Sequence, residues 1–263
     1  MRLRYKVLAI QLAVVVVALG LWQVLSVTGT LPDIYVSRPS EIAVALVDGF
    51  RSGQLTSALG DTLLETVIGF AIASVAGILA AFALHESPLL EQVCRPFLTA
   101  ANNMPRLALT SLFVLWLGVG TWAHVALIVT MVFFVVLINT YAGLSGSDRD
   151  YLILAKVLGA SRRKRFVTFQ FPQAIPAIFA GLQLGLTYAF MGAVIGEIIS
   201  GGSGLGALIS TYSSTYDSAG VFADLAVMAV VATVLSALIK AVESRLLGWR
   251  RHELRGLVPQ GDA

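Results

Sequence analysis

Residues 148–176 read DRDYLILAKVLGASRRKRFVTFQFPQAIP, a polar stretch between two long apolar runs. Its first part has apolar residues at i, i+3, i+4 and i+7, a spacing typical of a short helix with one apolar face. These residues are Tyr151, Leu154, Ala155 and Leu158. Asp148 or Asp150 can cap the start of this helix. Gly159 follows its last apolar residue, as expected of a glycine in the left-handed conformation just past a helix end.

A second, basic helix is predicted directly after the glycine. Ser161 is placed to cap it. Its first turn holds four consecutive cations, Arg162, Arg163, Lys164 and Arg165. Because the helix dipole disfavours cations at an N-terminus, local helix stability does not explain this charge. Pro172 and Pro176 mark the start of the next apolar run, where the missing N–H of proline costs little. An ordinary basic cytoplasmic loop remains the alternative interpretation of the cations.

The composition excludes an ordinary soluble domain. Hydrophobic residues make up 57% of the 263 residues and charged residues 13%, and the mean hydropathy is +0.83. These values are typical of a polytopic membrane protein, so we expect an all-α fold. The single Cys94 excludes a disulfide framework, and His85, His124 and His252 lie too far apart to suggest a metal site. We therefore predict no metal and no redox chemistry.

Six apolar runs are predicted to be transmembrane helices, because about 20 residues cross the ~30 Å hydrocarbon layer. They cover residues 7–27, 62–84, 107–119, 121–141, 174–199 and 221–247. The first run exceeds the apolar core of a signal peptide and lacks an Ala-x-Ala site after it, so we expect it to be retained. The third run is short, and it can also begin near Phe97 with a break at Pro105. Residues 40–50 form an amphipathic segment expected to lie along the outer membrane surface.

The distribution of the cations predicts the topology. If the N-terminus is cytoplasmic, sixteen of the eighteen lysines and arginines fall in inside segments, and only Arg38 and Arg51 fall outside. Arg95 and Arg106 are counted in an inside loop between the second and third spans. A six-span arrangement with both termini in the cytoplasm thus satisfies the positive-inside rule. It places the stretch 148–176 in the cytoplasm.

Small residues recur every four positions in two spans, a spacing that lets helix backbones approach closely. They are Gly69, Ala73, Gly77 and Ala81 in the second span, and Gly181, Gly185, Ala189 and Ala193 in the fifth. We interpret both stripes as packing surfaces, since a tight helix pair needs no chemistry. His124, near the start of the fourth span, is expected to be structural, with no partner visible in the sequence.

Glu197 lies near the far end of the fifth span and precedes a glycine-rich run, Gly201–Gly206. A phosphate-binding loop is excluded, because no Lys-Ser/Thr follows the glycines and no strand precedes them. Two interpretations of Glu197 remain. It is either an interfacial carboxylate that reaches water, or a residue that hydrogen-bonds the glycine run and shapes an outer gate. The candidate gate residues are Glu197, Gly202, Gly204 and Gly206.

The stretch 148–176 resembles the cytoplasmic coupling loop of ABC-importer permeases, the EAA loop. Its pattern is Glu-Ala-Ala, three residues, Gly, and later Leu-Pro. The second Ala, the Gly and the Pro of this pattern match Ala155, Gly159 and Pro172. The chain departs from the pattern at Ile153, Leu154 and Phe171. By this resemblance the coupling residues are Leu152, Leu154, Ala155, Leu158, Gly159, Ala160, Ser161, Arg162, Arg163 and Pro172.

Four further motifs look like the nitrate, sulfonate and taurine permease group, to which importers of pyrimidine precursors also belong. They are Arg38–Glu41, Asn103–Leu109, Leu115–Gly118, and Glu197 with Gly202–Gly206. The resemblance implies the type I ABC-importer permease fold, also called MetI-like. It divides the chain into an N-terminal helix with an extracytoplasmic amphipathic segment (1–59), a permease core (60–250) and a cytoplasmic tail (251–263).

The same resemblance implies the permease subunit of an ATP-driven importer in the cell membrane, for a small solute such as a sulfonate, taurine or nitrate. Two permease chains, expected to be a homodimer, would form the pathway within the lipid. Cytoplasmic ATPases would bind the coupling loops, and an extracytoplasmic binding protein would deliver the substrate. No nucleic acid is implied as a partner.

The chain itself is not expected to be an enzyme. It has no P-loop, and neither a Ser-His-Asp set nor paired metal ligands can be placed together, so we predict no catalytic residue and no cofactor. ATP would be used by the partner subunit. The alternative is a secondary transporter energised by an ion gradient, which would need charged residues at the midplane and usually internal repeats. A membrane-embedded enzyme would need polar clusters within facing spans.

Overall fold

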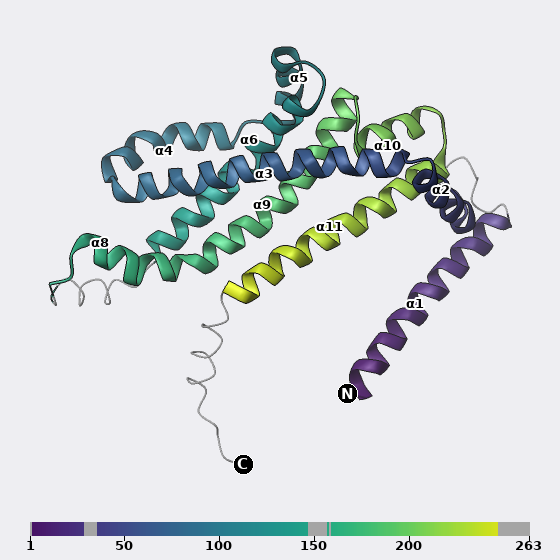
Figure 1. The fold of residues 1–263 in the computed structure, drawn as a ribbon, viewed down its shortest axis with the longest axis horizontal. Helices are drawn as coiled ribbons and strands as arrows, with labels where there is room; N and C mark the ends of the chain where they lie inside the picture. Colours follow the sequence, from purple (N-terminus) through teal and green to yellow (C-terminus); the bar gives the residue numbers. More distant parts are fainter. Residues whose placement is uncertain (1, 29–35, 147–156, 158, 247–263) are drawn as a thin grey trace.

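The computed structural model describes residues 2–28, 36–146, 157 and 159–246. Regular structure in these ranges is helical, which confirms the predicted all-α class (Figure 1). The helices are α1 (Arg2–Val27), α2 (Pro39–Arg51), α3 (Gln54–Glu86), α4 (Pro88–Asn102), α5 (Arg106–Leu117), α6 (Thr121–Ser145), α8 (Arg162–Arg165), α9 (Phe171–Ser200), α10 (Leu205–Ser214) and α11 (Ser218–Leu246). A π-helical segment, η1 (Phe166–Gln170), joins α8 to α9.

The centre of the molecule is the bundle of α3, α6 and α9. Its core is built from small and β-branched side chains, among them Ala73 of α3, Val132 of α6 and Ala193 of α9. A Cβ added at Gly77 would lie 2.9 Å from the carbonyl oxygen of Phe133, so the backbones of α3 and α6 touch there. The prediction that the small-residue stripes are packing surfaces is therefore confirmed.

The two ends of this bundle differ in chemistry, and we name them by it. The basic end is where α3 ends and where α8 and η1 lie; the glycine end is where α9 passes into α10 (Figure 1). From the glycine end α11 runs back along the bundle and packs on α9, α10 and α2. The predicted boundary at residues 59 and 60 falls inside α3.

Five helical segments within the described residues are long and apolar enough to cross a membrane. They are Tyr5–Val27, Gln54–Glu86, Thr121–Ser145, Phe166–Ser200 and Ser218–Arg245. The third predicted span is replaced by a pair of shorter helices, α4 and α5, separated at residues 103–105. The break at Pro105 is confirmed. With 12 residues, α5 is about 18 Å long and does not cross the hydrocarbon layer by itself.

The expectation that Arg95 and Asn102 lie in a loop is wrong. Both belong to α4, which turns back at Ser87 and runs alongside α3 (Figure 1). The sequence hides this helix because its polar residues share one face, so that no continuous apolar run marks it. Under the predicted orientation, Arg38 and Arg51 stay the only cations counted outside.

The first helix, α1, stands to one side of the bundle (Figure 1). It meets the rest through its last turns, where Trp22 packs edge-on against Phe222 of α11 at 5.4 Å between ring centroids. The Gln23 side chain accepts a 3.2 Å hydrogen bond from the Ser40 N–H at the start of α2. Large apolar side chains along α1, such as Ile10 and Val16, are exposed. The helix therefore presents an apolar surface suited to lipid or to another protein chain.

Candidate functional site

A buried polar cluster at the glycine end joins three helices. His124 of α6 and Glu65 of α3 are each only 1% exposed. The Nδ1 atom of His124 lies 2.9 Å from both carboxylate oxygens of Glu65, and its Nε2 atom is hydrogen-bonded to the hydroxyl of Ser200 in α9. Both polar atoms of the imidazole therefore have partners. The structural role expected of His124 is consistent with this, and its partners are Glu65 and Ser200, which the sequence does not reveal.

The hydrogen-bond directions in this cluster place a proton between His124 and Glu65. The Ser200 hydroxyl lies 2.9 Å from the Gly196 carbonyl and is hydrogen-bonded to Nε2 of His124, either as acceptor from an Nε2–H or as donor to a bare Nε2. The Nδ1 atom faces the carboxyl group of Glu65, which only accepts when ionised and can donate when protonated. The pair is satisfied as imidazolium and carboxylate, as neutral imidazole with Nδ1–H and carboxylate, or as neutral imidazole and protonated carboxyl. In each case a single proton bridges α3 and α6.

Glu197 of α9 is fully buried and holds the start of α10. Its Oε2 atom accepts a 2.7 Å hydrogen bond from the Gly206 N–H. A Cβ at Gly204 would overlap the Glu197 carboxyl group, so this close approach requires glycine. The interfacial interpretation, with a carboxylate reaching water, is therefore wrong. The predicted hydrogen bond to the glycine run is confirmed, whereas the gate role stays a prediction.

A second bond ties α10 to α3. The Leu205 N–H donates to the Thr62 hydroxyl at 2.9 Å. The first N–H groups of a helix have no partner within the helix, and here the first two are satisfied by side chains of α3 and α9. The carboxyl groups of Glu65 and Glu197 interact with each other, so both sets of bonds form one cluster.

Sequence reasoning missed Glu65, Thr62 and Ser200. A signal for Glu65 exists, because it is the only charged residue in the apolar run 62–84. Ionisable residues inside transmembrane segments usually pair within the bundle. Gly202 lies away from the carboxylate, with Val119 as its nearest neighbour, and its φ of +96° explains the glycine. Of the four gate candidates, the structure brings Glu197, Gly204 and Gly206 together.

At the basic end the predicted turn is present. Gly159 has a φ of +76°, which confirms the left-handed conformation. The Ser161 hydroxyl accepts a 3.3 Å hydrogen bond from the Lys164 N–H, which confirms the cap. Arg162 and Arg163 lie in α8, and Ala160 is half-buried just before it. The other coupling candidates before Gly159, namely Leu152, Leu154, Ala155 and Leu158, lie outside the described residues.

The helical chain continues from α8 through η1 into α9 without a turn. Pro172 is therefore inside a continuous helical segment, not between a basic helix and a separate span as expected. The N–H of Phe171 bonds to the carbonyl of Phe166, five residues back. Such a widened turn accommodates a local irregularity in a helix, here directly before the proline that lacks an N–H. Thus α8, η1 and α9 form one continuous helical segment.

Aromatic side chains fix this segment to the bundle. Phe82 of α3 lies 5.8 Å from Phe166 of η1 and 6.0 Å from Phe171 of α9, between ring centroids. Below them Leu144 of α6 packs with Ala174 of α9 in a buried cluster. These contacts hold the basic segment, which is formed by α8 and η1, against α3 and α6 as well as α9.

Residues 73–248 match a family model described as "Binding-protein-dependent transport system inner membrane component". This chain belongs to that family. The permease is therefore the membrane-spanning component of a transport system, as the EAA-type loop predicts. Family membership also agrees with the expectation of a transport component without catalytic activity of its own. No group of three His, Cys, Asp or Glu side chains that could hold a metal occurs in the part of the permease that the structure describes.

Three relatives resemble the permease over most of its length. It is 33% identical over 215 residues to the formylaminopyrimidine transport permease protein ThiX of Halalkalibacterium halodurans, covering 82% of this chain and 86% of that protein. It is 29% identical over 234 residues to the putative aliphatic sulfonates transport permease protein SsuC of Bacillus subtilis, covering 89% and 85%. It is 26% identical over 238 residues to the taurine transport system permease protein TauC of Escherichia coli, covering 89% and 86%.

Two solved structures share the fold. One is an amino acid ABC transporter crystallised with histidines, with a TM-score of 0.61 at 20% identity, covering 76% of the permease and 96% of that chain. The other is the MetNI methionine ABC transporter in inward-facing conformations, with a TM-score of 0.61 at 13% identity, covering 69% and 91%. These matches confirm the type I importer permease fold.

Proposed function

We propose that the permease is driven by a cytoplasmic ATPase that binds residues 152–165 and moves α8, η1 and α9 together. One observation carries this proposal: the basic segment continues into α9 without a turn and is fixed to α3 by the aromatic contacts of Phe82. A rigid connection of this kind transmits motion, which a flexible loop would absorb. The permease needs such a connection because its sequence contains no P-loop.

The proposed response to this motion lies at the glycine end. When α9 shifts, the bonds of Glu197 to Gly206 and of Ser200 to His124 break, and α10 and α6 are released from α9. Buried hydrogen bonds of this kind switch between made and broken states and do not stretch continuously, since an unpaired buried carboxylate is costly. The cluster is therefore suited to act as the outer gate.

The partners follow from the family and its relatives. The family description names a binding protein, and we propose that it docks at the glycine end and that two copies of the permease form the pathway. Relatives named for aliphatic sulfonates and taurine favour a small organic anion as the solute, and ThiX extends the range to a formylaminopyrimidine. We place both termini, and the basic end, in the cytoplasm. ATP binds the partner, and the permease itself is proposed to need no cofactor.

A cross-linking experiment tests the proposal. In a variant with Cys94→Ser and Leu154→Cys, a thiol cross-linker should join the permease to the ATPase with which it is coexpressed. Tyr216→Cys in the same background is the matched control, because Tyr216 is exposed at the glycine end and should not cross-link. Free reaction of Leu154→Cys with soluble thiol reagents in the assembled complex, without cross-linking, would contradict ATPase docking.

A further inference from the structure

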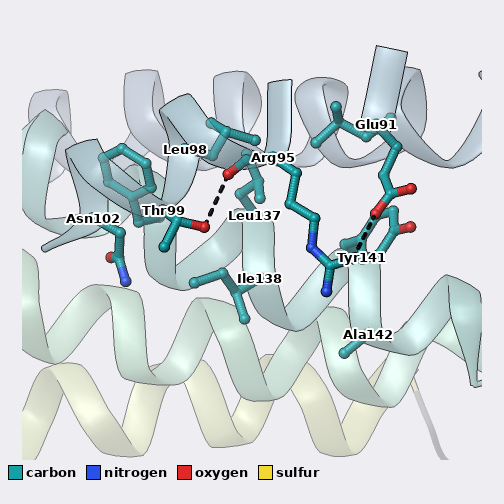
Figure 2. A pocket seen from close by; sticks show the side chains of 11 residues that line it. Glu91, Arg95, Leu98, Thr99, Asn102, Leu137, Ile138, Tyr141 and Ala142 are labelled. Atoms are coloured by element: carbon teal, nitrogen blue, oxygen red, sulfur yellow. Dashed lines mark hydrogen bonds and ion pairs between the residues drawn. The ribbon is translucent and has the colours of Figure 1, made fainter. Parts of the chain in front are cut away.

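A recess between α4 and α6 has a volume of about 380 Å³. Figure 2 shows Glu91, Arg95 and Asn102 projecting into it from α4, opposite Ile138 and Tyr141 of α6. Its size falls within the roughly 300–1,000 Å³ of small-molecule sites. Apolar side chains form most of its wall, and a few polar groups converge on it, which is the usual composition of a ligand site.

The amphipathic character of α4 is the reverse of that of a helix on a soluble protein. Its polar face, with Glu91 and Arg95, is turned toward α6 and the recess. On its other side Leu89 and Phe97 are each 73% exposed. In a membrane the exposed apolar side is suited to lipid, whereas polar residues face the bundle interior or a water-filled cavity. The orientation of α4 therefore indicates that the recess is hydrated.

Among the residues that line the recess, Arg95 pairs with Glu91, so the net positive charge beside it comes from Arg106, which contacts two of the lining residues. The ion pair of Arg95 with Glu91 is long, at 3.9 Å, and the Arg95 side chain is 78% exposed. At the other end Arg106 donates to the Asn102 carbonyl at 3.2 Å and lies 5.5 Å from the ring centroid of Phe134. Among the described residues no carboxylate pairs with Arg106.

One donor of Arg106 is free. Its Nε–H is buried and has no acceptor within the described residues. A guanidinium with an unused donor is suited to an oxyanion, because its planar donors match the oxygens of carboxylates, phosphates and similar groups. Phe134 and Asn102, which hold Arg106, also line the recess. The cation therefore stands at the end of the recess with its position fixed by two neighbours.

We propose that this recess binds a small organic anion as it passes through the permease. The inference rests on the proposed import function and names its class of substrate. The acid group of the solute would accept a hydrogen bond from Arg106, and its apolar part would lie against Phe134, Leu137 and Ile138. A guanidinium without a carboxylate partner and an apolar wall suit such a solute better than an uncharged one, which would leave the Nε–H of Arg106 without an acceptor.

Thiol labelling of the full chain in lipid nanodiscs tests the proposal. In a Cys94→Ser background, Ile138→Cys places a thiol in the recess away from the charged residues. An anionic sulfonatoethyl methanethiosulfonate should react with it faster than a cationic trimethylammonioethyl reagent of similar size. The matched control is Val93→Cys on the outward side of α4, where neither water-soluble reagent should react.

The arginines should set this preference. Arg106→Gln should lower the ratio of the two labelling rates by roughly tenfold, as expected for one unit charge near a partly hydrated site. Arg106→Lys should retain the ratio. Arg95→Gln, at a more exposed position, gives a second variant with little risk to folding and should lower the ratio in the same direction. Butanesulfonate, used as the probe anion, should slow labelling of Ile138→Cys and should not do so after Arg106→Gln.

Four results would overturn the proposal. Equal rates for the two reagents would show a recess without selectivity for anions. Faster labelling by the cationic reagent would show that the recess favours cations over anions. No labelling by either reagent would show that lipid or a second permease chain fills the recess. Unchanged labelling in butanesulfonate would show attraction without binding. None of these readouts needs ATPase docking or transport, so a failure here leaves the proposed import function standing, and a failure of coupling leaves the labelling unchanged.

Discussion

At the scale of single residues, Glu197 matters because its carboxylate is buried and bound to a backbone N–H. Glycines at 204 and 206 let the chain approach this carboxylate, so the sequence Glu-x₆-Gly-x-Gly has a structural reason beyond turn formation. A carboxyl group in such a position organises the start of α10 through one short hydrogen bond from the Gly206 N–H. An amide has the same shape, so replacing Glu197 by Gln tests the chemistry of the carboxyl group without changing the size of the side chain.

We expect Glu197→Gln to reduce transport while the permease remains in the membrane. The amide keeps the volume of the side chain but puts an NH₂ donor in place of one carboxyl oxygen, which costs about 1–3 kcal/mol where a buried polar group is left without a partner. Uptake by the assembled transporter and membrane abundance should be measured together. Asp48→Asn on the exposed face of α2 is the matched control and should transport normally. Normal uptake by Glu197→Gln would show that the gate does not need the carboxylate.

At the scale of elements, the feature to test is the turn at Gly159, directly before the basic segment. Gly159 separates the coupling candidates at 152–158 from the continuous helix of α8, η1 and α9. A Cβ at Gly159 would have no neighbour within 4 Å, so a substitution there acts through backbone conformation alone. The residue therefore tests the geometry of the turn without a packing effect.

Gly159→Val should abolish ATPase docking and uptake while membrane abundance changes little. At a φ of +76° a side chain costs about 1–2 kcal/mol, and a β-branched one more. Gly159→Asn is the matched variant, because asparagine tolerates the left-handed region and should retain docking. Copurification of the ATPase, uptake and abundance distinguish the outcomes. If Gly159→Val still copurifies the ATPase and transports, Gly159 is not a hinge of the coupling segment.

The link between α3 and α6 through Glu65 and His124 is a second property of elements. We expect Glu65→Gln and His124→Gln each to destabilise the permease, by about 3–5 kcal/mol if the partner is left charged and unpaired. The double variant should lose less than the sum, because neither charge then remains buried alone. Thermal unfolding of the purified variants in detergent measures this. Strictly additive losses would show that the two side chains do not interact in the membrane-embedded protein.

For the whole molecule, the distribution of cations predicts the orientation of the bundle. A reporter that is active only in the cytoplasm should be active when fused before Met1 and when fused after Ala263. It should be inactive when inserted after Gly202, in the run between α9 and α10 at the glycine end. Sixteen of the eighteen cations were counted inside, and the excess is large enough to set orientation even without Arg95 and Arg106. The opposite pattern of reporter activities would show that the permease is inserted the other way round, with the basic segment out of reach of a cytoplasmic ATPase.

By itself the sequence determined the all-α class, most of the spans, the left-handed turn at Gly159, the cap at Ser161 and the family. Each of these depends on neighbours within a few residues, or on a motif whose spacing is visible along the chain. The exceptions are instructive. The helix α4 escaped because its polar face interrupts the apolar run, and hydropathy averages over faces that only packing distinguishes.

Only the tertiary structure decided which polar groups meet. Glu65 and His124 are 59 residues apart, and His124 and Ser200 are 76 apart, so no local pattern pairs them. The same holds for the recess. It exists only because α4 and α6 pack side by side, which brings Arg95 and Arg106 near the same cavity. The physical reason is that burial sets the value of a polar group. A glutamate among apolar residues is costly until a partner from another helix satisfies it, and that partner is fixed by packing.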